Sequence, residues 1–473
     1  MKKISILFVA ALAFLSASCD KDFEIVNSDP NNPLEVPAHL MLGNIIRVNQ
    51  NVIYGMQQGG DMGMCWGQHV SKVQYNDEER YIPRRAAIDG IWDNIYASVI
   101  SDAKSMYTLA DAEGNESIKG ISLIMQANGF QILTDLFGPI PFTEAAQSGV
   151  LKPAYDSQEV VYTGILEMLT KADALLAKGQ GAVPASSDLI YGGDIAKWRK
   201  LANSLKLKSL MRISKKVNVA SQVAALVTSG NLMSSNADSA NLTYLVAQPD
   251  ANPIYETIVF GSRAEYKVSS VLVNKLQSYS DPRLAVIAAK NNAGLYVGNK
   301  PGEENTSNYN GFSALGSFYL NPTLAGVILS YSQVEFYLAE AANEGYISGG
   351  VATALAHYNK GIQSSFDFNG ISSEGAAYIA QPNIVFTNQA QARVSIGEQM
   401  WISLFGQGFE AWTEWRRTGY PALSPVIDAK ESRIPTRLYY NSNELALNKA
   451  NYEAAVGTLT GGDKLTSPLW WMN

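Results

Sequence analysis

The sequence predicts a mainly α-helical protein that is built on pairs of helices and carries a large loop-rich subregion. Apolar residues recur at three- and four-residue spacings in several long segments, for example in residues 88–99, 160–169 and 201–213, which is the period of an amphipathic helix. Residues 238–325 differ, because Asn, Gly, Ser, Pro and Tyr dominate there and the apolar runs are short. We expect loops and a few short strands in that part.

The N-terminus predicts export and a lipid anchor. Lys2 and Lys3 precede an apolar run over residues 4–15, which is too short to span a bilayer and is typical of a signal peptide. Small residues then lead to Cys19, in a pattern that resembles a lipoprotein cleavage box. We therefore expect residues 1–18 to be removed and Cys19 to become the acylated first residue. The alternative is an ordinary secretory peptide with an incidental cysteine.

Length and composition limit the remaining possibilities. The chain has 473 residues and a formal net charge of −7, which argues against nucleic acid as a partner. Of its two cysteines, Cys65 has no partner within the chain if Cys19 is acylated, so we expect no stabilising disulfide. Residues 19–37 are polar and turn-rich and predict a lipidated tether. No linker divides residues 38–473, which predicts a single domain with the loop-rich insert at about 238–325.

One helical pair is predicted in detail. Ser332 and Glu335 match a capping box before a helix over residues 334–344, and glycines at 345, 349 and 350 separate it from a second helix through residues 354–362. Small or facing residues of this pair resemble the packing positions of a tetratricopeptide repeat; they are Ala339, Ala342, Ala354, Tyr358 and Ile362. Residues 88–111 with 117–137, and 157–178 with 195–214, are candidates for degenerate copies. Glu335, Glu340 and Glu344 are interpreted as a solvated face, and His357 as a surface residue.

Several sequence blocks carry a family resemblance that covers nearly the whole chain. They are residues 135–145 (DLFGPIPFTEA), 197–208 (KWRKLANSLKLK), 399–402 (QMWI), 408–421 (GFEAWTEWRRTGYP), 434–440 (IPTRLYY) and 468–471 (PLWW). In type and order these blocks resemble the signatures of the SusD/RagB family, in its SusD-like branch. The blocks also read as scaffold: we expect a rigid turn at Gly138, a core position for Trp198, and Arg416 and Arg417 holding carbonyls or acidic partners.

The resemblance implies a cell-surface lipoprotein of the outer membrane with no catalytic residues and no cofactor. Such a protein captures a nutrient, here expected to be a glycan, and delivers it to a TonB-dependent transporter resembling SusC. The acidic stretch Asp20-Lys21-Asp22 resembles the sorting signal of such lipoproteins. Three alternatives stay open: a peptide as the cargo, a repeat-scaffold adaptor without a small ligand, and an extracellular glycosidase.

The sequence contains no specific catalytic motif. The three histidines, His39, His69 and His357, lie far apart in the sequence and lack the spacing of a zinc site, so no metal is expected. The run at Gly406 and Gly408 fits a dinucleotide fingerprint in spelling only, since no strand is predicted before it. Two carboxylates facing each other across a cleft, as glycosidases require, are not visible in a sequence.

The candidate ligand site lies where aromatic and amide side chains alternate. Its residues are Trp66, Gln68, Gln74, Tyr75, Asn76 and Tyr81, and the loop with Tyr296, Tyr309 and Phe312 is expected to face them. Flat rings bind the apolar faces of sugars, and amides bind hydroxyl groups. The flanking residues 59–63 and 77–80 resemble an exposed loop. In the alternative interpretation, Trp66 and Tyr75 pack in the core against Trp92 and Tyr96.

Overall fold

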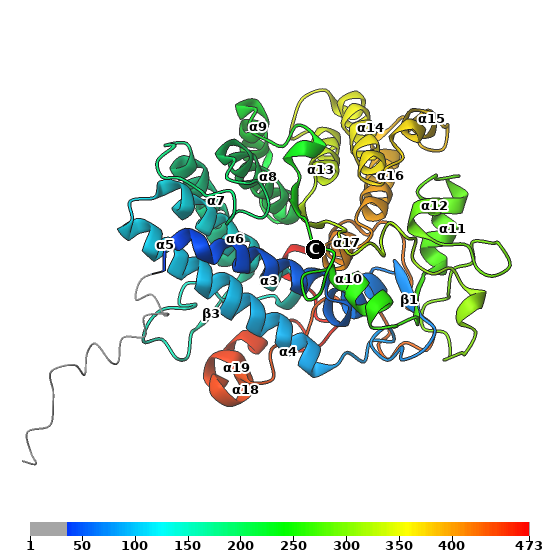
Figure 1. Cartoon of the computed structure of the whole chain (residues 1–473), viewed down its shortest axis with the longest axis horizontal. Coiled ribbons are helices and arrows are strands. Elements are labelled where there is room, and N and C mark those ends of the chain that lie inside the picture. Colours follow the sequence, from blue (N-terminus) through cyan, green and yellow to red (C-terminus); the bar gives the residue numbers. More distant parts are fainter. Residues whose placement is uncertain (1–35, 473) are drawn as a thin grey trace, which may run out of the picture.

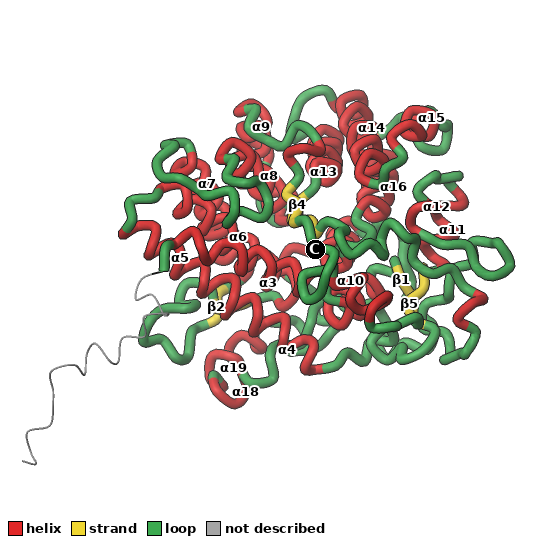
Figure 2. The backbone as a smooth tube through the Cα atoms, in the orientation of Figure 1, coloured by secondary structure: helices red, strands yellow, loops and turns green. Residues whose placement is uncertain are grey.

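The computed structural model describes residues 36–472 and is dominated by helices, which confirms the predicted fold class (Figures 1 and 2). The longer helices are α3 (Leu42–Tyr54), α4 (Arg85–Asn94), α5 (Asp102–Ala112), α6 (Glu116–Phe137), α7 (Gln158–Leu176), α8 (Ile195–Ile213), α9 (Ala220–Ser229), α11 (Ser270–Ser278), α13 (Tyr331–Asn343), α14 (Gly350–Phe368), α16 (Gln389–Ser403), α17 (Gly408–Thr418) and α19 (Lys449–Thr458). Short helices are α10 (Pro253–Tyr255), α12 (Leu284–Ile287), α15 (Gly375–Ile379) and α18 (Glu444–Leu447). Among the described residues, no helix is long and apolar enough to cross a membrane.

The helices pack as consecutive pairs. Helix α6 contacts both α5 and α7, α7 contacts α8, and α13 packs along α14 and α16. Figure 1 shows α5 to α8 side by side in one half of the molecule and α13 to α16 in the other. These pairs coincide with the segments in which the sequence predicts paired helices. The five predicted packing residues of the α13–α14 pair are all buried: Ala339, Ala342, Ala354, Tyr358 and Ile362.

Polar side chains at the N-cap fix where several helices begin. Asn115 accepts a hydrogen bond from the backbone N–H of Ile118 at the start of α6, and Ser157 and Asp194 do the same for α7 and α8. Helix α13 begins earlier than the capping-box prediction, because its cap is Ser330, whose Oγ accepts from the N–H of Gln333 at 3.2 Å. Ser332 instead donates to the carbonyl of Gly361 on α14 at 2.7 Å.

The interpretation of the α13 glutamates as a solvated face was wrong. Glu335 is buried, and its Oε2 lies 2.6 Å from Nδ1 of His357. His357 is half-buried, not the surface residue that was expected. Glu340 binds Arg417 at 2.6 Å, and Glu344 binds Arg393 at 2.7 Å. The carboxylates face other helices because α13 is covered on more than one side, by α14 and by α16.

The residues expected to be scaffold occupy the core as predicted. Trp198 is fully buried and donates its ring N–H to Asp188 at 2.7 Å. Arg416 donates to the backbone carbonyls of Asp135 and Thr436 at 2.7 and 2.8 Å. Helix α6 ends at Phe137, and Gly138 turns the chain with a φ of 95°, a value that L side chains rarely adopt.

The described strands form three short antiparallel pairs. They are β1 (Val70–Lys72) with β5 (Tyr266–Val268), β2 (Ile140–Pro141) with β3 (Tyr155–Asp156), and β4 (Ala240–Leu242) with β6 (Gly326–Leu329). Strands β4 and β5 lie in the segment that the sequence marks as loop-rich, and each pairs with a strand outside it. The long loops of that segment are therefore tied to the helical body.

Residues 59–63 do not form the expected exposed loop. They are buried in the π-helical segment η2 (Met56–Met64), which packs against α17. A Cβ added to Gly63 would lie 2.5 Å from the carbonyl carbon of Gly408, so both positions require glycine. Of residues 77–80, Glu78 and Glu79 are also buried. The glycines thus lie where two helices cross closely. Flexible loops are also rich in glycine, so composition alone does not distinguish the two structures.

Candidate functional site

A cluster of polar and aromatic side chains surrounds the β1–β5 pair. The strands align Val70 with Val268, Ser71 with Lys267 and Lys72 with Tyr266. One face of this ribbon and the turns beside it carry the group that we call the β1–β5 site: Gln74, Tyr75, Arg263, Glu265, Lys267 and Tyr309. It joins three parts of the chain, namely the turn after β1, the start of β5 and the short helical turn η6 (Tyr309–Gly311).

Two tyrosines of the site present their rings at the surface. Tyr75 is 64% exposed and has a φ of 55°, a left-handed conformation that turns its backbone sharply after β1. Tyr309 is half-buried, and its hydroxyl donates a 2.6 Å hydrogen bond to Oε1 of Gln74. The guanidinium of Arg263 lies 5.7 Å from the ring centre of Tyr75, and the ammonium of Lys267 lies 5.8 Å from that of Tyr309. Each ring is thus held beside a cation.

The charges of the site are unequally paired. Arg263 binds Glu265 through Nε at 2.6 Å and Nη2 at 2.5 Å, and this hydrogen bonding raises the pKa of the guanidinium further. Burial lowers the pKa of Lys267, and the charge of Glu265 opposes the effect only in part. Burial, followed by the charge of Glu265, raises the pKa of Tyr309, so its hydroxyl stays protonated as a donor. The site therefore combines a flat aromatic surface with one net positive charge.

A buried ionic network lies beneath the site and fixes the two strands. Lys72 of β1 donates to Asp61 and to Glu78, each at 3.1 Å, and Arg84 binds Asp61 at 2.6 Å. From β5, the hydroxyl of Tyr266 donates to the same Asp61 carboxylate at 2.6 Å. Because each of these groups is held by a charge or a hydrogen bond, displacing either strand exposes unpaired polar groups and costs free energy. The site is therefore built on a rigid base.

Four predicted site residues lie inside the protein instead. Trp66 is fully buried and donates to the carbonyl of Glu78 at 2.8 Å, and its ring contacts those of Trp412 and Tyr81 rather than Trp92 and Tyr96. Gln68, Asn76 and Tyr81 are buried as well, with hydrogen bonds to Ser424, Glu303 and Val426 of distant loops. With their polar atoms engaged in this way, they support the surface that Gln74, Tyr75 and Tyr309 form.

The remaining predicted residues, Tyr296 and Phe312, lie on the same long loop as Tyr309 and make no hydrogen bond to the residues of the site among those described. Tyr296 is half-buried, with the ammonium of Lys290 5.6 Å from its ring centre, and its carbonyl accepts from Gln277. Phe312 is half-buried next to η6. Arg263, Glu265 and Lys267 were not predicted from the sequence as site residues. The alternation of these charged residues with Ala264, Tyr266 and Val268 is the two-residue period of a strand with one polar face, and that signal was present.

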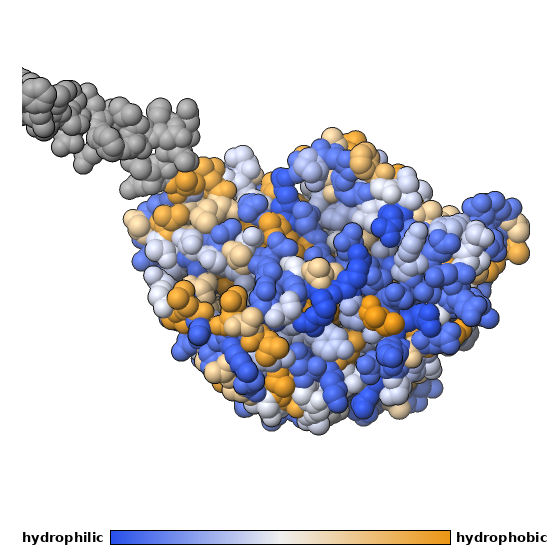
Figure 3. All heavy atoms as spheres, turned by 90° about the horizontal axis from the view of Figure 1, so that it is seen from below, coloured by the Kyte–Doolittle hydropathy of each residue, from blue (hydrophilic) through white to orange (hydrophobic). Residues whose placement is uncertain are grey.

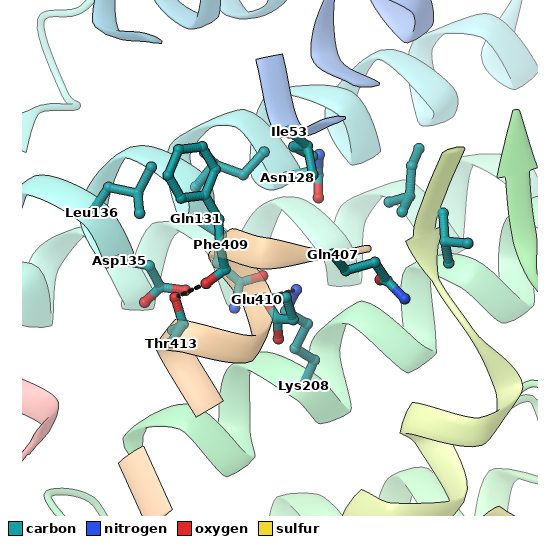
Figure 4. Close-up of a pocket in the computed structure, with 13 residues that line it drawn as sticks. Ile53, Asn128, Gln131, Asp135, Leu136, Lys208, Gln407, Phe409, Glu410 and Thr413 are labelled. Carbon is teal, nitrogen blue, oxygen red and sulfur yellow. Dashed lines mark hydrogen bonds and ion pairs between the residues drawn. The ribbon is translucent and has the colours of Figure 1, made fainter. Parts of the chain in front are cut away.

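Two hollows elsewhere are less suited to a sugar. A cavity of about 40 Å³ lies between α6, α8, α17 and β6, where Lys208 pairs with Glu410 at 2.8 Å and Asp135 faces inward (Figure 4). At roughly 10–15 Å³ for each water, it holds a few water molecules and no sugar ring. An open groove of about 590 Å³ beside α7 and α8 has Trp470 as its one aromatic residue. Within residues 36–472, no group of His, Cys, Asp and Glu is placed to hold a metal ion.

Comparisons with known proteins agree on one family. The family model SusD-like, described as "Starch-binding associating with outer membrane", matches residues 30–441. A comparison with curated proteins finds no match.

Among solved structures, a chitin-binding protein is 26% identical at a TM-score of 0.81, covering 93% of this chain and 100% of its own. A chitin-binding SusD homolog from Flavobacterium johnsoniae is 25% identical at a TM-score of 0.81, covering 92% and 98%. An outer-membrane protein from Bacteroides vulgatus, described as probably involved in nutrient binding, is 26% identical at a TM-score of 0.77, covering 93% and 100%. Since the family model spans most of its length, the chain belongs to the SusD-like family.

Proposed function

We propose that this protein is a cell-surface lipoprotein that captures an oligosaccharide at the β1–β5 site and delivers it to a SusC-like TonB-dependent transporter of the outer membrane. The observation that carries the proposal is the exposed ring of Tyr75 beside Tyr309, in a group rich in hydrogen-bonding side chains. The starch-binding description of the family, and the two similar structures of chitin-binding proteins, support a glycan as the ligand.

The chemistry of the site suits a sugar. A tyrosine ring covers the apolar C–H face of a pyranose, while Gln74 and the Tyr309 hydroxyl offer donors and acceptors for its hydroxyl groups. Burying roughly 60 Å² on each ring contributes about 1.5 kcal/mol at ~25 cal/mol per Å². With two rings and the cost of association, we expect a dissociation constant between about 1 µM and 1 mM.

Capture without catalysis is the simpler account of the site. Glycoside hydrolysis requires two carboxyl groups that flank the scissile bond. Glu265 is the one carboxylate in the β1–β5 site as defined, and Arg263 occupies it at 2.5 Å. The proposal therefore assigns no catalytic residue and no cofactor to this chain.

The proposed anchor and the transporter require a defined orientation. Cys19 lies outside the described residues, and the described chain joins the body at Ala38, whose N–H donates to Glu113 at the end of α5 at 2.8 Å. Figure 3 views the molecule from the side of α18 and α19, where hydrophobic residues gather in patches among polar ones. Leu445 and Leu447 of α18 are exposed there.

A second exposed leucine segment lies beside α18. Leu151 is exposed on the loop that ends at Pro153. The side chain of Asn451 donates to the carbonyl of Lys152 at 3.0 Å, and that of Asn448 donates to the carbonyl of Pro153 at 2.9 Å. Exposed leucines on adjoining segments are typical of a protein contact. We infer that this leucine surface, Leu151 with Leu445 and Leu447, takes part in docking to the transporter.

The glycan part of the proposal is tested by binding. The mature protein, immobilised through a C-terminal tag, is exposed to a panel of neutral and acidic oligosaccharides. We expect retention of at least one class in the stated affinity range, and loss of that retention in Tyr75→Ala. Failure to retain any member of the panel, or full binding by the variant, contradicts capture at this site.

The transporter part is tested by gentle extraction from cells that express the neighbouring transporter gene. We expect the full-length protein to co-purify with a large outer-membrane barrel, and Leu445→Glu with Leu447→Glu to weaken this association. Val385→Glu changes an exposed residue between α15 and α16, away from the leucine surface, and serves as the matched control. A parent protein that migrates alone contradicts the partnership, whereas a double variant that co-purifies fully contradicts only the docking surface.

A further inference from the structure

Lys267 is a buried cation without a partner. Its residue is 5% exposed, yet among residues 36–472 its ammonium has neither a hydrogen bond nor an ion pair. The nearest carboxylate along the chain is Glu265, which lies two residues before Lys267 and directly ahead of β5. Arg263 binds Oε1 of that carboxylate through two nitrogen atoms, at 2.5 and 2.6 Å. Two cations thus share one carboxylate, which leaves one net positive charge beside Tyr309.

This arrangement is unfavourable for the protein alone. A buried charge loses hydration, and a protein ordinarily compensates that loss with a counter-charge or hydrogen bonds. Loss of hydration by burial lowers the pKa of Lys267. By contrast Lys72, on the facing strand, is also buried and binds two carboxylates. Of these two lysines, Lys267 is therefore the one whose ammonium has no ion pair among the described residues.

That ammonium lies at the proposed glycan surface. The ammonium is 5.8 Å from the ring centre of Tyr309, whose hydroxyl is held by Gln74. The ammonium is not fully enclosed, so it reaches solvent at this surface. A sugar lying on Tyr309 would bring a substituent at its ring edge within reach of Lys267.

We propose that Lys267 binds an anionic substituent of the captured glycan, so that the cargo is an acidic oligosaccharide carrying carboxylate or sulfate groups. The inference rests on the proposed function and adds the substrate class to it. General attraction does not explain such a preference, because the whole chain has a formal charge of −7 and repels polyanions. Discrimination has to arise at the site itself, where charge-assisted hydrogen bonds form in a partly dry environment.

The test compares sugars that differ in one class of charged group. Oligogalacturonides are measured against their fully methyl-esterified form, which removes the carboxylates, and chondroitin sulfate oligosaccharides against the desulfated backbone, which keeps its uronate carboxylates and loses only the sulfates. Both comparisons use titration calorimetry at fixed ionic strength. Chitin and starch oligosaccharides are the neutral references. We expect one acidic class to bind about ten- to a hundred-fold more tightly than the counterpart that lacks its carboxylate or sulfate groups. The pair that shows the difference identifies carboxylate or sulfate as the group.

Variants of Lys267 assign the preference to this side chain. Lys267→Met keeps the length of the apolar stem and should abolish the discrimination, whereas Lys267→Arg keeps the charge and should retain most of it. Lys300→Met removes an exposed charge from the adjacent loop and should leave the ratio unchanged. Melting temperatures and circular dichroism of all three variants show whether the fold is intact, and Lys267→Gln takes the place of Lys267→Met if that variant fails to fold.

The outcomes separate this inference from the function on which it rests. Binding of neutral glycans with equal or higher affinity overturns the acidic preference and leaves glycan capture intact. An acidic preference that survives in Lys267→Met, or that disappears equally in Lys300→Met, overturns the role of Lys267. Absence of binding to every acidic and neutral sugar overturns both proposals together.

Discussion

The ring of Trp66 meets the ring of Trp412 edge to face, with the two centroids 5.0 Å apart and the planes at 78°. Trp412 belongs to α17, and its own ring N–H donates to the carbonyl of Pro435 at 2.9 Å. The contact joins the segment before β1 to the C-terminal part of the chain. Trp66 thereby holds the base of the β1–β5 site without reaching its surface.

The different positions of Trp66 and Tyr75 predict opposite effects of truncation. Trp66→Ala removes a fully buried ring and should lower the free energy of unfolding by about 3–5 kcal/mol. Tyr75→Ala removes an exposed ring and should leave the melting temperature nearly unchanged while glycan binding is lost. Thermal unfolding and binding titration of both variants measure the two effects. Reduced stability in Tyr75→Ala with intact binding would remove Tyr75 from the site.

The crossing of η2 and α17 predicts that Gly63 tolerates no side chain. A Cβ there would lie 2.5 Å from backbone atoms of Gly408 and Phe409, which belong to a buried helix and cannot move aside cheaply. Gly63→Ala should therefore destabilise the protein by about 1–3 kcal/mol or more. Gly457→Ala is the matched control, since nothing lies within 4 Å of a Cβ in α19. That substitution should be neutral or stabilise by up to about 1 kcal/mol, as urea unfolding would show.

The pairing of helices was predictable because its signals are local. The recurrence of apolar residues at three- and four-residue spacings is set within a few residues of the helix that it specifies, so the pairs α5–α6 and α7–α8 could be predicted from it. The burial of Glu335 was not predictable in the same way. Its partner His357 lies on the next helix, and a single helical period does not tell which polar residues face a second neighbour.

Only part of the candidate site was predictable, because its contacts join residues that lie far apart in the sequence. Gln74, Tyr75 and Tyr309 were identified by composition, but the hydrogen bond from Tyr309 to Gln74 spans 235 residues and follows from tertiary contacts alone. Trp66 shares the composition of a binding segment and is nevertheless core, because the glycines beside it let α17 approach closely. The proposed anion-binding role of Lys267 depends on the ion pair between Arg263 and Glu265, which the sequence does not show.

The proposed lipid anchor predicts a change of compartment on mutation of Cys19. Cys19→Ala should yield a soluble or uncleaved protein that is absent from the outer-membrane fraction. Each buried acyl methylene contributes about 0.8 kcal/mol, so several chains hold a protein on the membrane effectively permanently. Cell fractionation with immunoblotting measures the distribution, and Cys65→Ser, which changes the buried cysteine, is the control for loss of a thiol. Identical fractionation of parent and Cys19→Ala contradicts the anchor.

Glu79 predicts a stability that depends on pH around neutrality. The residue is fully buried, its Oε2 accepts from the N–H of Lys72 at 3.0 Å, and its Oε1 has no partner among the described residues. Burial raises the pKa of Glu79 from 4.5 to about 7, although the hydrogen bond from the backbone N–H of Lys72 lowers it in part. The folded protein therefore holds a proton that the unfolded chain releases near its ordinary pKa.

The sign of the effect follows from that difference. Between pH 4.5 and 7 the folded state binds more protons than the unfolded state, so the contribution of Glu79 to stability is lost as pH rises through this range. At about 1.4 kcal/mol for each pKa unit, the loss amounts to roughly 3 kcal/mol. Glu79→Gln removes the titration while keeping the shape, and it should unfold at higher urea concentration than the parent at pH 8. At pH 4.5 the two should be nearly equal. Glu304→Gln, on an exposed turn nearby, should follow the parent at both pH values. Parallel stability curves for parent and Glu79→Gln from pH 4.5 to 8 would show that Glu79 is ionised in the folded protein throughout.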